Sequence, residues 1–171
     1  MKKRLFAIAL SLLVFGSACS VKLNKMTDKQ KSELLATERG RLPDLDNPVE
    51  KTRSYITISE ILLDFAAGAA TDGDVGAVKS LLDQYTAAIR SARDTMLESD
   101  LDAERRPAGY RDLEISLRGQ IRRLDDMQRQ LSTDDRRPVT DALDIAAAIR
   151  EQMLRRLFPQ SSASRSGLDL S

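Results

Sequence analysis

Two residue types that carry much of enzyme chemistry are nearly absent from this chain. Its 171 residues include one cysteine, Cys19, and no histidine. A single cysteine cannot form an intrachain disulfide. The lack of histidine excludes His-dependent nucleophile triads, most zinc sites and the Glu-x-x-His sites of di-iron bundles. Carboxylate, lysine, tyrosine and serine chemistry remain open, but we expect no catalytic residue, no cofactor and no metal site.

The acidic pair Glu60 and Asp64 is the first candidate for chemistry. The two carboxylates are one helical turn apart in the most apolar stretch of the predicted domain, and such a pair can bind a cation or share a proton. Arg53 and Thr57 belong to the same stripe, because residues at steps of three and four share one face of a helix. The sequence therefore favours a solvent-exposed polar stripe over a functional pair.

Arginines on two predicted helices are the second candidate, a basic face for anionic lipid headgroups or a protein partner. They are Arg118, Arg122, Arg123, Arg150, Arg155 and Arg156. Acidic residues are interspersed with them, at Asp125, Asp126, Asp134, Asp135 and Glu151. A solvent-exposed face laced with salt bridges is the commoner outcome of such a pattern, and both interpretations stay open.

The amino terminus has the pattern of a secretory signal peptide. Residues 1–4 (MKKR) are basic, an apolar run follows over 5–15, and residues 16–18 are small. This order of a basic start, an apolar run and small residues is typical of a signal sequence with its cleavage site. A membrane-spanning helix needs about twenty apolar residues, and polar residues already begin at Ser20. We predict that residues 1–18 are a cleaved signal peptide.

The segment Gly16-Ser17-Ala18-Cys19 resembles the lipobox of bacterial lipoproteins. The resemblance covers only the leader, and Gly16 stands where that family favours leucine. It implies that the Cys19 thiol carries lipid and that the chain is cut just before it. Two or more acyl chains give stable membrane anchoring. Ser20 favours the outer over the inner membrane by the sorting rule of enterobacterial lipoproteins. Ordinary cleavage after Ala18 without lipid stays open as the alternative.

Charge and length indicate one domain that does not bind nucleic acid. Lysine plus arginine number 27 and aspartate plus glutamate 26, so the net charge is +1. Loss of the three basic residues of the leader changes it to −2. Binding to phosphates needs a concentrated cationic face, so we predict no nucleic-acid partner. The roughly 150 mature residues fit one domain with a real core.

Hydrophobic periodicity predicts five helices and no strands. The predicted spans are about 28–39, 48–70, 75–98, 107–131 and 138–158. A capping box at Thr27 and the pair Asn47-Pro48 mark two of the starts, and Gly40 is a plausible stop for the first helix. The remaining predicted units are a lipidated cysteine with its tether (19–27), a helical domain (28–158) and a disordered serine-rich tail (159–171).

Apolar stripes on the last three predicted helices identify the candidate core. The third helix carries a heptad seam, formed by Val78, Leu82, Tyr85, Ile89, Ala92 and Met96. The stripe of the fourth is Tyr110, Leu113, Leu117, Ile121, Leu124 and Met127 or Gln128. The stripe of the fifth is Val139, Ala142, Ala146, Ile149, Met153 and Leu157. The three tyrosines, Tyr55, Tyr85 and Tyr110, are expected at the edge of the core with their hydroxyls in water.

Four long helices joined by short connections predict antiparallel neighbours. The predicted fold class is all-α, an antiparallel up-down-up-down four-helix bundle with a short extra N-terminal helix. Stacked helical hairpins of the tetratricopeptide-like kind are the runner-up. Those repeats recur at about 34 residues, and the sequence has no such period.

The leader and the amphipathic helices together favour a membrane-anchored lipoprotein of the cell envelope. Lipid on Cys19 would hold it at a membrane, facing the periplasm, with the outer membrane favoured. Its helical domain would be a non-catalytic scaffold or would bind an envelope protein of unknown identity. The alternative is a periplasmic helical carrier of a small apolar ligand, with room left by the small residues at 66–70 and 146–148. An enzyme is the least favoured class.

Overall fold

A computed structural model describes residues 23–159, and every regular element within that range is helical. The α-helices are α1 (Asp28–Arg41), α2 (Pro48–Thr71), α3 (Val75–Leu97), α4 (Ala108–Gln130) and α5 (Arg137–Leu157). The short 3-10 helices are η1 (Leu23–Lys25), η2 (Leu42–Asp44) and η3 (Thr133–Asp135). The predicted all-α class is confirmed. Each end of the five α-helices lies within two residues of its predicted position.

Side-chain caps set the starts of α1 and α2. The Thr27 hydroxyl accepts a hydrogen bond from the Gln30 amide, and the Gln30 side chain accepts one from the Thr27 amide, which completes the predicted capping box. Asn47 accepts hydrogen bonds from two amides of the first turn of α2, and Pro48 is the first residue of that helix. The predicted stop at Gly40 is wrong, because α1 continues through it for one further residue.

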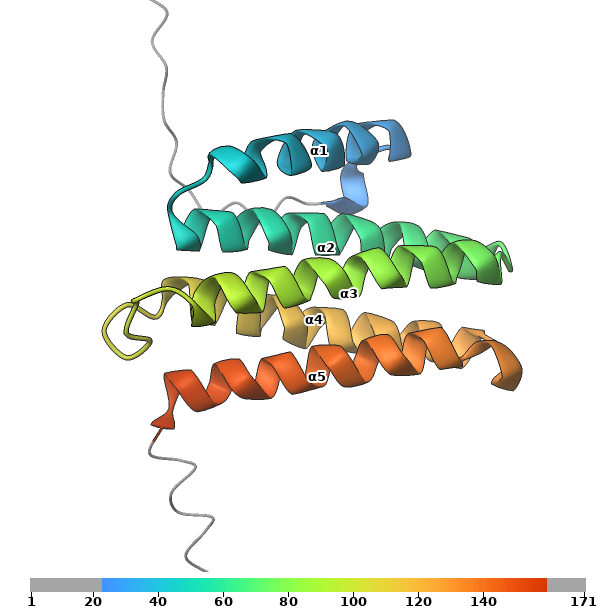
Figure 1. Ribbon diagram of the computed structural model, residues 1–171. Helices are drawn as coiled ribbons and strands as arrows, with labels where there is room; N and C mark the ends of the chain where they lie inside the picture. Colours follow the sequence, from blue (N-terminus) through green and yellow to red (C-terminus); the bar gives the residue numbers. More distant parts are fainter. Residues whose placement is uncertain (1–22, 160–171) are drawn as a thin grey trace, which may run out of the picture.

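The turn between α2 and α3 depends on a glycine and an aspartate. Gly73 has a φ of 74°, a left-handed conformation that is costly for residues with a Cβ. The next residue, Asp74, accepts a hydrogen bond from the amide of Ala77 at 2.9 Å and so caps α3. The chain therefore reverses within a few residues, and α2 and α3 lie side by side (Figure 1).

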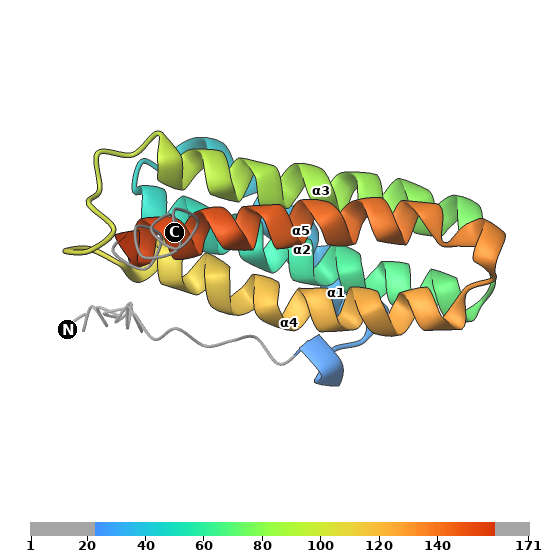
Figure 2. The same ribbon diagram turned by 90° about the horizontal axis from the view of Figure 1, so that it is seen from below.

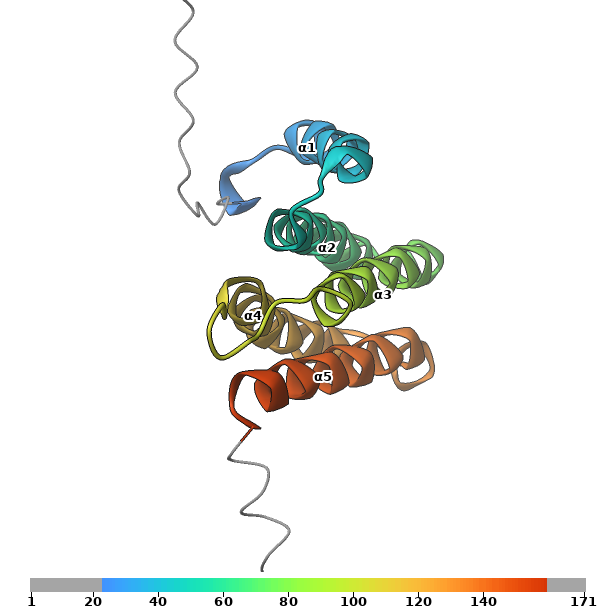
Figure 3. The same cartoon turned by 60° about the vertical axis from the view of Figure 1, so that its left-hand side comes forward.

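The long helices pack as two pairs. α2 packs most extensively against α3, and α4 packs against α5. The pairs meet where α2 lies against α4 and α3 against α5, whereas α3 and α4 make few contacts although they are consecutive. Figure 2 shows α5 beside both α3 and α4, and Figure 3 shows the α2–α3 pair stacked on the α4–α5 pair. Helix α1 packs on the outer side of α2.

The predicted seam of α3 is buried along its whole length. All six of its residues, from Val78 to Met96, are at most 2% exposed. On α5 the stripe from Val139 to Met153 is equally buried, while Leu157 at the helix end is half-buried. These stripes meet in one hydrophobic core, and burial of that apolar surface is the main source of stability.

The buried stripe of α4 differs from the predicted one at one position. Ile121 is only half-buried, whereas Gln120 is 3% exposed. The buried residues therefore step from Leu117 to Gln120 to Leu124, by three and then four. That spacing continues a heptad seam better than the predicted step to Ile121. A polar side chain thus occupies a core position and needs hydrogen-bond partners there.

Gly109 allows the start of α4 to approach the end of α3 closely. A Cβ at this position would lie 2.8 Å from Met96 Cε and would also collide with Met96 Sδ. Met96 is fully buried and has little room to move aside. We expect Gly109→Ala to lower the free energy of unfolding by about 1–3 kcal/mol through overpacking. Urea denaturation followed by circular dichroism measures this change.

Gly119, on the same helix, provides the matched control. A Cβ there meets nothing within 4 Å, so only the backbone term changes. We expect Gly119→Ala to raise the free energy of unfolding by about 0.5–1 kcal/mol, because alanine favours a helix interior over glycine. Equal effects of the two substitutions would contradict the close approach of Gly109 to Met96.

Candidate functional site

Cys19 lies outside residues 23–159, as do the predicted signal peptide and most of the serine-rich tail. Their cleavage, lipidation and disorder stay predictions. Within the described range, buried or half-buried polar side chains gather around three carboxylates, Asp64, Glu60 and Glu114. These three clusters, and one groove beside the third, are the candidate functional features.

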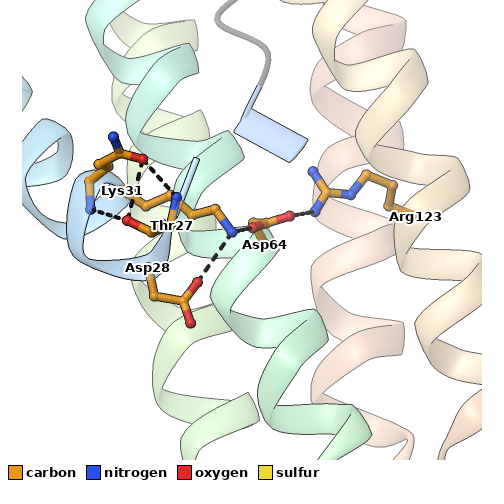
Figure 4. A network of polar contacts seen from close by, with 6 residues as sticks. Thr27, Asp28, Lys31, Asp64 and Arg123 are labelled. Carbon is orange, nitrogen blue, oxygen red and sulfur yellow. Dashed lines mark hydrogen bonds and ion pairs between the residues drawn. The ribbon is translucent and has the colours of Figure 1, made fainter. Parts of the chain in front are cut away.

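The carboxylate of Asp64 joins three helices (Figure 4). Its Oδ2 lies 2.6 Å from Nζ of Lys31 on α1, and its Oδ1 lies 2.9 Å from Nη2 of Arg123 on α4. Lys31 also contacts Asp28, at 3.3 Å, within α1. The Lys31 side chain is only 12% exposed, so water screens this pair less than a surface pair. The hydrogen bond to Asp64 raises the pKa of Lys31, although desolvation opposes the shift.

Glu60 begins a chain of hydrogen bonds that enters the core. The Ser116 hydroxyl donates to Glu60 Oε1 at 2.9 Å. Gln120 Nε2 donates to the hydroxyls of Ser116 and Ser59, at 2.8 and 2.9 Å. The Tyr85 hydroxyl donates to Gln120 Oε1 at 3.0 Å. This chain links α2, α3 and α4, and a buried network of this kind favours one register among the helices.

The prediction of a solvent-exposed stripe at Glu60 and Asp64 is wrong. Both residues are half-buried: Asp64 contacts α1 and α4, and Glu60 contacts α4. Burial raises the pKa of Glu60, against the opposing effects of the Ser116 hydrogen bond and the Arg123 charge. The two carboxylates bind different partners and form no pair. Residues 23–159 contain no group of three acidic, cysteine or histidine side chains that could hold a metal.

Two of the tyrosine hydroxyls bond within the protein, so the prediction that they face water is wrong. Tyr85 is fully buried and bonds Gln120, and burial raises the pKa of its phenol. Tyr110 is 3% exposed and donates to the carbonyl of Met96 at 2.7 Å. That carbonyl lies in the last turn of α3, where carbonyls lack partners within the helix. Tyr55 is half-buried against the core.

The six arginines of the predicted basic face do not share one surface. Arg118 and Arg150 both reach Glu114, between α4 and α5. Arg123 instead reaches Asp64 on α2. At 3.6 residues per turn, Arg123 lies about half a turn around α4 from Glu114, so it faces the other way.

The other three arginines are exposed. Arg155 contacts Glu151 at 3.3 Å, one turn away on α5, while Arg122 and Arg156 lie on the surfaces of α4 and α5. Four of the six arginines therefore form ion pairs, as the salt-bridge interpretation expects. Binding of lipid headgroups or a partner by this set stays a prediction.

Glu114 is the most buried acidic side chain within residues 23–159, at 4% exposure, and it binds two arginines. Its Oε2 lies 2.7 Å from Arg118 Nη2, and its Oε1 lies 2.9 Å from Arg150 Nε. Desolvation would raise the pKa of Glu114, but the hydrogen bonds from Arg118 and Arg150 outweigh it and lower the pKa. The cluster joins α4 to α5 and keeps one net positive charge.

An open groove lies beside Glu114, between α4, the loop before it and the end of α5. Its volume is about 600 Å³. The lining side chains are Ala103, Pro107, Ile115, Leu154, Leu157 and Phe158, with Glu104, Arg111, Glu114 and Arg118. Ile115 is 52% and Phe158 58% exposed, and these are the exposed large hydrophobic side chains within residues 23–159. Both belong to this groove, which we call the α4–α5 groove.

Three residues that bind two or more others are not among the candidates that the sequence predicts: Lys31, Glu114 and Gln120. Gln120 carries a usable signal, because it occupies a heptad position between leucines. Glu114 carries a weaker one, as it follows the buried Leu113 directly and has arginine four residues later. Lys31 carries none, since its partner on α2 is remote in the sequence.

Comparisons of the chain with protein-family models, with curated proteins and with solved structures find no match. Within residues 23–159 no helix is both long and apolar enough to cross a membrane. Function is therefore argued from the side chains themselves.

The opposite pKa shifts of Glu60 and Glu114 predict opposite effects of pH. A group whose pKa is raised by folding contributes stability below its unfolded pKa, and this contribution is lost as the pH rises through its folded pKa. A group whose pKa is lowered by folding contributes stability above its unfolded pKa, and this contribution is lost as the pH falls through its folded pKa. We therefore expect Glu60→Gln to stabilise the fold near pH 7 and to lose that gain near pH 4. Glu114→Gln should lower the free energy of unfolding near pH 7, and should lower it less near pH 3. Urea denaturation at each pH measures both.

Glu151→Gln is the control for removal of a surface charge. Glu151 is exposed and pairs only with a neighbour one turn away on α5, so its loss should change stability by less than about 0.5 kcal/mol at either pH. Effects of the same sign for Glu60→Gln and Glu114→Gln near pH 7 would contradict the two environments described above.

Proposed function

We propose that this chain is a cell-envelope lipoprotein, anchored through Cys19, whose helical domain is a non-catalytic module that binds a partner protein. The leader supports the anchor, because a basic start, an apolar run and small residues precede the only cysteine. The groove between α4 and α5 supports the binding role.

We also infer that α2 to α5 form a four-helix bundle that runs up-down-up-down along the chain, with α1 as an extra helix outside it. The few contacts between α3 and α4 indicate that these two helices lie diagonally, so the bundle consists of two antiparallel pairs rather than of antiparallel neighbours throughout. The support is the short connections, the pairing of α2 with α3 and of α4 with α5, and the shared core. A bundle of this kind is rigid enough to present a fixed surface to a partner.

The single observation that carries the binding role is the position of Ile115 and Phe158. Isolated exposed apolar residues are ordinary, but contiguous apolar surface with a polar rim is typical of an interaction site. Arg111, Arg118 and Glu104 line the same groove, and Glu114 is paired with Arg118 and Arg150. Three arginines against two glutamates leave one net positive charge at the groove. The matching occupant is an amphipathic helix of an envelope protein, with apolar residues on one side and acidic residues beside them.

The carrier alternative has weaker support. Ala66 and Ala146, which could have left room for a ligand, are fully buried within the hydrophobic core, where small residues let helices pack closely. The α4–α5 groove has a volume in the range of ligand sites, about 300–1,000 Å³. It is open along its length, however, and a small apolar ligand there would keep much of its surface in water.

The mass of the native protein, extracted in detergent from its own host, tests the anchor. We expect a chain that begins at Cys19 and carries added acyl chains. A chain that begins at Cys19 without lipid would overturn the anchor and leave a soluble periplasmic protein. A co-extracted small apolar molecule would favour the carrier alternative instead.

A photo-crosslinking amino acid at position 115 tests the α4–α5 groove in the native host. We expect one specific protein adduct from position 115 and none from position 130, an exposed site on α4 that neither lines the groove nor belongs to the predicted basic face. The crosslinked segment should be an acidic amphipathic helix. A synthetic peptide of that segment should then bind purified protein, and Ile115→Gln should weaken binding about tenfold, as expected for a central apolar contact.

Gln130→Ala is the matched control, because it alters an exposed, uncharged residue of the same helix outside the groove. It should change peptide binding by less than about twofold. Equal crosslinking from positions 115 and 130, or peptide binding that Ile115→Gln leaves unchanged, would overturn the groove as the partner site.

A further inference from the structure

Helix α1 is attached to the rest of the domain mainly through polar groups. Of its 14 residues only Glu38 is buried, whereas α2 has nine buried residues. The two leucines of α1, Leu34 and Leu35, are half-buried, and Leu35 packs against the main core. Burial of apolar surface therefore contributes less to holding α1 in place than it does for α2, since that contribution is proportional to the area removed from water.

Three polar contacts join α1 to the other helices. They are Lys31 with Asp64, Glu38 with the Ser54 hydroxyl, and Arg39 with Gln84 at 2.8 Å. Among residues 23–159 the Lys31–Asp64 pair is the one ion pair between α1 and another helix, and its 2.6 Å separation is short for such a pair. All three contacts include an ionised group and are charge-assisted, but only in the Lys31–Asp64 pair are both partners charged. Coulomb attraction adds to the hydrogen bond there, so we expect this pair to contribute most to the attachment.

The residues beneath α1 lie mostly outside the main core. Ile61 is fully buried but does not belong to that core. It lies on the same face of α2 as Ser54 and Asp64, by the spacing of a helix, and both of those residues contact α1. Leu23 of η1, just before α1, is likewise buried outside the main core. Release of α1 would uncover Ile61 and remove the packing of Leu35, whereas the buried residues of the main core all belong to residues 58–153 and would keep one another as partners.

Because α1 lies between Cys19 and α2 in the chain, its release would change the length of the tether. Leu23 follows Cys19 by four residues, which reach at most about 14 Å. Asn47, the cap of α2, follows Cys19 by 28 residues, which reach about 95 Å when fully extended and roughly 30 Å as a flexible coil. The tether between a lipid on Cys19 and the rest of the domain therefore depends on whether α1 is docked.

We propose that α1 is a releasable clasp, closed mainly by the Lys31–Asp64 ion pair, that sets the reach of the domain from its membrane anchor. The membrane consequence rests on the proposed lipidation of Cys19, whereas the clasp itself does not. When the clasp is closed, the domain is held close to the bilayer. When it opens, α1 and the segments on either side of it lengthen the tether and the bundle stays folded.

Hydrogen–deuterium exchange of the full mature chain tests the clasp. Lys31→Met keeps the side chain as far as Cε and leaves Asp64 paired with Arg123. It removes the contact between α1 and Asp64 and also the contact of Lys31 with Asp28 within α1. We expect exchange within residues 28–41 to rise about tenfold or more, as for loss of a charge-assisted hydrogen bond. Exchange in α3 and α5 should not change. Lys31→Arg, which can still pair with Asp64, should restore most of the protection.

Two outcomes would overturn the clasp. One is unchanged protection of α1 in Lys31→Met. The other is a rise in exchange that spreads equally over α1, α3 and α5, which would make α1 an integral part of the fold. Lys79→Met is the matched control, because it removes an exposed ion pair with Asp83 within α3 and should leave α1 protected as before.

The reach is measured on acylated protein in phosphatidylethanolamine–phosphatidylglycerol vesicles. Asp144→Cys places a dye on the exposed side of α5, and energy transfer to a labelled lipid reports the distance from the bilayer. Lys31→Met should lower the transfer relative to the otherwise unchanged chain. Equal transfer would overturn the tether consequence. Protein that gains no lipid and stays in solution would instead overturn the proposed anchor, and the exchange experiment would still decide the clasp.

Discussion

The arrangement of α1, α2 and α4 depends on one carboxylate. Asp64 is half-buried, and its two oxygens contact cations from two other helices, Lys31 and Arg123. Removing one partner of a poorly solvated pair costs more than the pair contributes, because a charge is left without compensation. Lys31, Asp64 and Arg123 are therefore coupled, because the carboxylate that holds α1 in place also joins α2 to α4. Ion pairs join these three helices, whereas apolar packing joins α2 to α3.

The same reasoning explains why three of the predicted arginines do not form one basic face. Glu114 binds two guanidinium groups between α4 and α5, and Asp64 binds a third on the other side of α4. These arginines join helices and point to different sides of α4. Near the start of α4 and the end of α5, two large apolar side chains, Ile115 and Phe158, are exposed among charged ones. A partner at this groove would gain more from apolar burial than from charge, with the arginines at its edge selecting orientation.

Periodic patterns in the sequence predict the fold well because they report burial locally. The α3 seam from Val78 to Met96 and the cap at Asn47 depend only on residues within a turn or two. The sequence predicts Ile121 instead of Gln120 in the buried stripe of α4, because a polar residue is not expected in a core. Only the partners of Gln120, Tyr85 and Ser59, explain its burial. The contacts of Asp64 join residues 33 and 59 positions apart. No local pattern encodes such distances, so the exposed stripe was the natural but wrong prediction.

The clasp and the groove lie on different sides of the domain. Helix α1 packs on the outer side of α2, and α5 lies at the opposite side (Figure 1). Packed helices are about 8–10 Å apart, so a partner at the α4–α5 groove would be roughly two helix layers from the face that carries the tether. None of the residues that attach α1 lines that groove. Opening the clasp would therefore change how far from the membrane the groove can meet a partner, without changing the affinity of the groove for that partner. Reach and affinity can thus vary independently.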